Sequence, residues 1–124
     1  MRMKFKNIDH IVITTQNLEA CLHFYADILG MDRGRYAVRF GQQKFNIHTR
    51  KAEFLPAAEH PTYGSLDLCL ILDGSLDEAK QEIEEKGYLV ELGPVARHGA
   101  RGEMRSIYLR DPDRNLVELA EYSM

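Results

Sequence analysis

Apolar and polar positions repeat one order of elements along the chain. In the first half, the β-branched segment 8–14 predicts a strand, and apolar residues at helical spacing predict a helix between Asn17 and Gly30. Two short extended segments follow at 36–40 and 44–49, with a turn between them. Only four residues separate Met31 from Tyr36, so an intervening strand is reduced to a stub.

The second half returns to the same order. Segment 66–72 predicts a strand, Ser75 and Glu78 form a capping box, and the helix that follows ends at Gly87. Further strands are predicted at 89–92, 105–109 and 116–122, with Gly93 and Pro94 as a break. Both halves are therefore βαβββ modules, about 4–49 and 64–124, joined by a linker at 50–63.

These modules predict an α+β fold. Neither half alone has enough apolar surface for a stable core, so we expect the two modules to pack as one domain over residues 1–124. Strand alternation then separates two faces, because successive side chains point to opposite sides of a sheet. The leucines of 66–72 should face the helix, which leaves Asp67 and Cys69 on the other side. The same reasoning places His10 and Glu118 on helix-free faces.

Composition limits the function classes. The chain has 124 residues, 44% hydrophobic and 28% charged, and 16 basic against 19 acidic residues give an interleaved net charge of −3. Binding to nucleic acid or to a membrane surface through bulk charge is therefore not expected. No apolar run approaches the roughly 20 residues of a membrane span, and no signal peptide is evident, so we expect a cytoplasmic protein. Cys21 and Cys69 are expected to be buried, reduced side chains rather than a disulfide.

Three segments carry a family resemblance: Asp-His-Ile at 9–11, the helix at 17–31, and the ending SIYLRDPDRNLVEL at 106–119. They resemble the vicinal oxygen chelate superfamily of glyoxalases, extradiol dioxygenases and fosfomycin or bleomycin resistance proteins. The similarity covers almost the whole chain and is greatest to small glyoxalase-like proteins of the lactoylglutathione lyase type. It implies that the modules curl into a trough that binds a divalent metal, and that the protein is a homodimer.

The resemblance places His10 and Glu118 at metal-ligand positions. Asp67 falls where the family commonly has a histidine, and it would bind the metal directly, orient another ligand, or be purely structural. For the remaining position, Asn46 and His48 share one strand face, and His48 is the better donor. The expected metal set is His10, His48, Asp67 and Glu118, and these nitrogen and oxygen donors suit Ni, Zn, Mn or Fe(II).

Substrate contacts are expected on the neighbouring strands. Ser106 and Tyr108 share one strand face and match cavity residues of fosfomycin-resistance relatives, although ordinary strand hydroxyls are the alternative. Segment 96–103 has the composition of a mobile loop, from which Arg97 or Arg101 would clamp an anionic substrate. A solvated loop explains these arginines equally well. Cys69 either lines the pocket or is simply packed, and packing is the favoured interpretation.

The resemblance implies a metal-dependent lyase or isomerase for a small substrate that chelates the metal through neighbouring oxygens. Glu118 would be the catalytic base in such an enzyme. The alternatives are an extradiol-type dioxygenase, which needs Fe(II) and usually two histidines, and a metal-free drug-binding protein of the bleomycin-resistance kind. The presence of His10 and Glu118 at the ligand positions favours a metalloprotein over a metal-free drug-binding protein.

Overall fold

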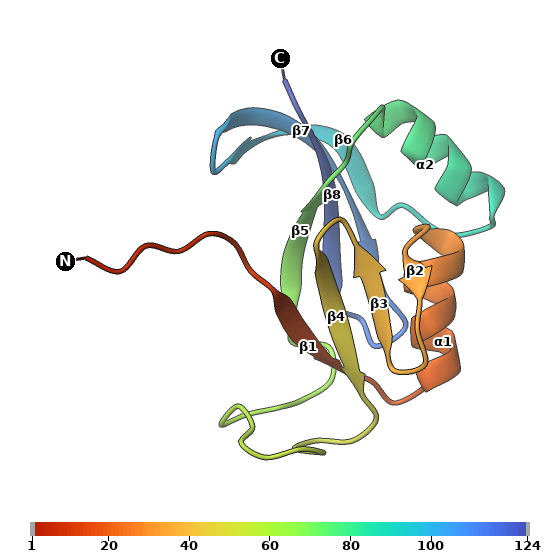
Figure 1. Cartoon of the computed structure of the whole chain (residues 1–124). Coiled ribbons are helices and arrows are strands. Elements are labelled where there is room, and N and C mark those ends of the chain that lie inside the picture. The colour runs from red at the N-terminus through yellow and green to blue at the C-terminus, as the bar shows by residue number, and fades with distance from the viewer. Residues whose placement is uncertain (1, 124) are drawn as a thin grey trace. The chain divides into compact units, whose positions relative to one another are not determined.

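The computed structural model describes residues 2–123 and divides into two compact units, with the boundary between Thr62 and Tyr63. Unit 1 comprises β1 (His10–Thr14), α1 (Leu18–Leu22), the π-helix η1 (His23–Ile28), β2 (Asp32–Arg33), β3 (Ala37–Phe40) and β4 (Gln43–His48). Unit 2 comprises β5 (Asp67–Ile71), α2 (Leu76–Glu85), β6 (Leu92–Gly99), β7 (Gly102–Arg110) and β8 (Leu116–Tyr122) (Figure 1). The α+β prediction of two βαβββ repeats is confirmed.

The sheet of unit 1 has the strand order β1-β4-β3-β2, with β1 and β4 parallel. Ile13, Phe45 and Ile47 are buried on one face, where the ring of Tyr25 from the helix meets the ring of Phe45 edge-on at 5.5 Å. The predicted stub is β2, which is two residues long. The helical segment covers one face of this sheet and leaves the face of His10 and Val12 free of helix.

The predicted first helix is not α-helical throughout. The side chain of Asn17 accepts a hydrogen bond from the Ala20 amide at 3.0 Å, as expected of an N-cap. From His23 to Ile28 the backbone is a π-helix, and the Leu29 amide bonds to the carbonyl of Phe24, five residues earlier. The wider turn still buries Phe24, Tyr25 and Ile28, so the apolar face is preserved.

The sheet of unit 2 repeats the arrangement, with the order β5-β8-β7-β6 and a parallel β5–β8 pair. Ile107, Leu109, Val117 and Leu119 form its buried face. The side chain of Glu121 accepts a hydrogen bond from the Leu76 amide at 3.0 Å and thereby ties the start of α2 to β8. This places α2 on the buried face and leaves the face of Glu118 free of helix, as strand alternation predicts.

One strand prediction in unit 2 was wrong. The strand expected at 89–92 is β6, which runs over Leu92–Gly99 and includes Gly93 and Pro94. The pairing register shifts between Leu92 and Val95, and Gly93 adopts φ 113, where an added Cβ would collide with the Ser106 carbonyl. Glycine there allows β6 to approach β7 closely, so the sequence break marks a bulge inside a strand.

Candidate metal and substrate site

His10 is the first residue of β1 and lies on the helix-free face of unit 1. Its Nδ1 is 2.8 Å from the Asp9 carboxylate, and this hydrogen bond holds the pKa of Asp9 below its ordinary value. An ionised carboxylate only accepts, so Nδ1 is the donor, and in the neutral form of the ring Nε2 then carries the lone pair. Histidines that bind metals are commonly held by such a carboxylate, which sets the tautomer and the ring direction.

The strand register separates the other two unit 1 residues considered as ligands. His10 is paired with Lys44, Asn46 with Val12, and His48 with Thr14. His48 is therefore four strand residues further along than His10, about 13 Å at the usual rise. Its ring also lies edge-on to Phe54 at 5.2 Å. Asn46 is two residues closer to His10 and shares its face.

Glu118 is central on the helix-free face of unit 2, paired with Cys69 on β5 and with Tyr108 on β7. The buried Ser106 hydroxyl donates to Glu118 Oε2 at 2.6 Å, so one carboxylate oxygen is held from the neighbouring strand. Ser106 and Tyr108 share one face of β7, as alternation predicts, and the register with β8 shows that this is the face of Glu118. Ser106 contacts Glu118 directly.

Cys69 is exposed, and the expectation that it is packed was wrong. Partial burial raises the pKa of its thiol to about 11, and the charges of Glu118 and Asp67 together with a hydrogen bond to Glu118 add to the effect. The thiol therefore stays protonated at neutral pH. Cys21 is buried as expected, and both cysteines are free.

Asp67 is the first residue of β5, as His10 is the first residue of β1. In both units, the residue that pairs with this first residue lies two positions before a candidate ligand on the neighbouring strand. Asp67 is paired with Leu116, two residues before Glu118, just as His10 is paired with Lys44, two residues before Asn46. In the internal repeat, Asp67 thus corresponds to His10 and Glu118 corresponds to Asn46. Sequence reasoning preferred His48, because donor strength was weighed without the register.

The segment expected to be a mobile loop, 96–103, is a β-hairpin formed by β6 and β7. Arg97 belongs to β6, and its Nε donates to the Tyr108 hydroxyl at 2.8 Å while its guanidinium lies 5.3 Å from the Tyr108 ring centre. Tyr108 accepts this bond and keeps its own proton for another acceptor. Arg101 lies in the hairpin turn, with its guanidinium 4.4 Å from the ring centre of Tyr122.

The donor chemistry of these residues fits a divalent metal. His10 supplies an oriented imidazole, and Asp67 and Glu118 supply carboxylates on one sheet face, a nitrogen and oxygen set typical of such ions. Within residues 2–123, no cluster of three or more His, Cys, Asp or Glu side chains forms a metal site. The donors are divided between the two units, with His10 in the first and both carboxylates in the second.

The fold and these positions define a family. The chain belongs to the Glyoxalase/Bleomycin resistance protein/Dioxygenase superfamily, whose family model matches residues 7–119. Over the part of the chain that the structure describes, no helix is long and apolar enough to cross a membrane.

Two proteins are similar to this one over nearly the whole chain. The virulence protein STM3117 of Salmonella typhimurium is 41% identical over 98% of this chain and 88% of its own length. Its crystal structure gives a TM-score of 0.93 at 40% identity and covers 98% of this chain and all of that one. An integron cassette protein of V. cholerae gives 0.92 at 41% identity, covering 99% and 100% of the two chains.

A lactoylglutathione lyase from Agrobacterium tumefaciens is a more distant neighbour. It gives a TM-score of 0.71 at 24% identity and covers 95% of each chain, which is a likeness of fold alone. The comparisons therefore establish the superfamily, whereas the reaction has to be argued from the site.

Sequence reasoning missed Asp9, although the Asp-His pair at the start of the strand was the available signal. It also passed over Tyr88, Arg110 and Arg114, which line a hollow at the end of β7. Nothing in the periodicity marks these three residues, because the α2–β6 connection, the end of β7 and the turn after β7 bring them together.

Proposed function

We propose that this protein is a metal-dependent lyase or isomerase whose small substrate chelates a divalent ion through neighbouring oxygens. His10, Asp67 and Glu118 are the proposed ligands. Asn46 is preferred to His48 for the fourth position, since its register corresponds to that of Glu118. The observation that carries the proposal is the Asp9–His10 bond, because it leaves Nε2 free to bind a cation.

The other residues of the helix-free face have distinct roles in this proposal. A bound Ni, Zn, Mn or Fe(II) ion would act as a Lewis acid that stabilises an anion developing on the substrate. Ser106 holds Oε2 of Glu118, so the carboxylate keeps one orientation while it takes a proton from carbon beside a carbonyl. Tyr108, fixed by Arg97, donates its proton to a substrate oxygen.

A metal-free binding protein is the second candidate, favoured by apolar side chains on the helix-free faces. Val12 is 38% exposed and Ile71 is 48% exposed, and both offer contact area to an apolar ligand. One structural neighbour, TnmS3 from Streptomyces, is described as an antibiotic binding protein, at 20% identity and a TM-score of 0.74. An extradiol dioxygenase is less well supported, because the register offers no second histidine beside His10.

Metal analysis separates the two classes. Purified protein is loaded with Ni, Zn, Mn or Fe(II), desalted and measured by elemental analysis. We expect about one bound ion per protein chain in the wild type, and we expect that ion to be lost in His10→Ala and in Glu118→Gln. Asp9→Asn should weaken binding by about tenfold, since it releases the ring without removing a ligand.

His23→Ala is the matched control. His23 forms the same 2.8 Å bond with Asp27 that His10 forms with Asp9, but it lies on the helical segment. Full metal content in His10→Ala, or equal loss in His23→Ala, would refute the ligand assignment. Glutathione hemithioacetals, catechols and thiol-dependent epoxide opening would then distinguish the reactions, and sedimentation would test the expected homodimer.

A further inference from the structure

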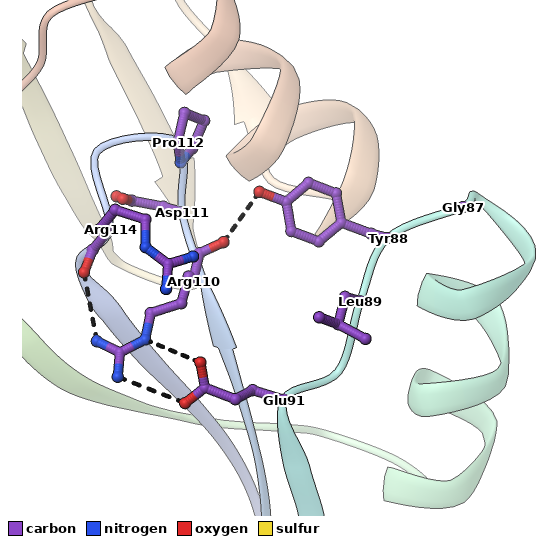
Figure 2. A pocket seen from close by; sticks show the side chains of 8 residues that line it. All are labelled: Gly87, Tyr88, Leu89, Glu91, Arg110, Asp111, Pro112 and Arg114. Atoms are coloured by element: carbon purple, nitrogen blue, oxygen red, sulfur yellow. Dashed lines mark hydrogen bonds and ion pairs between the residues drawn. The ribbon is translucent and has the colours of Figure 1, made fainter.

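Unit 2 contains a hollow of about 370 Å³ that shares no residue with the face of Glu118 (Figure 2). It is formed by the connection from α2 to β6 and by the end of β7 with the turn that leads to β8. The walls are Gly87, Tyr88, Leu89, Glu91, Arg110, Asp111, Pro112 and Arg114. Its volume lies in the usual range for small-molecule sites.

Most polar groups of this hollow are already paired. The Tyr88 hydroxyl donates to the Arg110 carbonyl at 2.9 Å. The Arg110 guanidinium donates to both carboxylate oxygens of Glu91, at 3.2 and 3.4 Å, and to the Arg114 carbonyl at 3.4 Å. The charges of Arg110 and Glu91 therefore cancel locally, and the Tyr88 ring is fixed as a wall.

Asp111 is also fully engaged. Its buried carboxylate accepts hydrogen bonds from the backbone amides of Asp113 and Asn115 and from the side-chain amide of Asn115, at 2.8 to 2.9 Å. These bonds hold the turn that carries Arg114. The turn therefore holds the backbone of Arg114 in a fixed position.

Of the two described arginines that line the hollow, Arg114 is the one whose guanidinium is not paired with a carboxylate. Within residues 2–123 its guanidinium forms no hydrogen bond or ion pair, and Figure 2 shows the side chain reaching across the hollow toward Tyr88. Its backbone has φ 73, a left-handed conformation that glycine or asparagine adopts more readily. An arginine here costs stability, and within the described residues no hydrogen bond or ion pair of its guanidinium offsets that cost.

We propose that this hollow binds a small monocarboxylate carried on a flat apolar group, with Arg114 as the carboxylate clamp. The guanidinium offers paired donors that match a carboxylate, and Tyr88, Leu89 and Pro112 offer apolar walls. The Glu91 charge is offset by Arg110, but the Asp111 carboxylate also lines the hollow, which disfavours a dianion. The site is separate from the proposed metal chemistry, so either proposal can fail alone.

Benzoate is the test ligand, titrated into full-length protein and followed by the backbone amide signals of residues 87–91 and 110–115. We expect saturable shifts in the wild type. Arg114→Gly should weaken binding by at least about tenfold, because a charge-assisted pair is lost. The same variant should melt at a higher temperature, since glycine relieves the left-handed strain.

Ala52→Gly is the matched control, because Ala52 also has positive φ, at 52°, and lies in unit 1 away from the hollow. It should raise the melting temperature and leave benzoate binding unchanged. Equal binding of benzamide, or unchanged binding in Arg114→Gly, would overturn carboxylate recognition by Arg114. Tighter binding of phenyl phosphate would overturn the preference for a monoanion, and no shift in the wild type would overturn the site.

Discussion

At the scale of single residues, the side chain of Asn115 connects two separate segments of unit 2. Its side-chain oxygen accepts from the Leu66 amide at 2.9 Å, and its side-chain nitrogen donates to Asp111 at 2.8 Å. Asn115 is 1% exposed, so both partners depend on it rather than on water. One amide thus joins the start of β5 to the turn that ends β7.

Asn115→Ala should therefore lower the free energy of unfolding by about 3 kcal/mol, because a buried amide and a buried carboxylate each lose a partner. Urea denaturation at neutral pH measures the loss. Asn7→Ala, at an exposed position outside any helix or strand, should change stability by less than about 0.5 kcal/mol. Similar values for the two variants would contradict the role given to Asn115.

At the scale of elements, the helix starts follow local chemistry. Asn17 and Ser75 both have extended backbones and accept hydrogen bonds from amides three residues later. These bonds need only nearby chain, which is why both starts were predictable. The π-helix of η1 and the bulge in β6 were not predictable, because packing against the sheet and pairing with β7 decide them.

Asn17→Ala should cost about 1 kcal/mol of stability, since the Ala20 amide loses its acceptor. Asn17→Ser supplies another acceptor at the same place and should recover most of that loss. Urea denaturation of the pair measures the cap separately from helix packing. Equal loss in both variants would show that Asn17 stabilises unit 1 by another route.

At the scale of the whole molecule, the proposed metal ligands come from both units. A metal that binds only the folded chain stabilises it by about 2.7 kcal/mol at one hundred times its dissociation constant. This gain should appear as a rise in melting temperature on adding the preferred ion. If one ion needs ligands from both units, His10→Ala and Glu118→Gln should each abolish the entire rise.

His23→Ala should keep the full rise in melting temperature on adding the ion. It is the control for an exposed histidine paired with an aspartate. A half-sized rise in both ligand variants would indicate two independent weak sites, one in each unit. That outcome would contradict a shared ion, whereas the family assignment would stand.

The sequence by itself determined the repeated βαβββ order, the helix starts, the helix-free face of His10, Asp67 and Glu118, and the common strand face of Ser106 and Tyr108. Each of these follows from spacing along the chain, which is a local property. Tertiary structure alone decided the offset of Asn46 and His48 from His10, the fixing of Arg97 on Tyr108, and the hollow around Arg114. Strand register and loop proximity join residues that are distant in sequence, and periodicity within one segment carries no information about them.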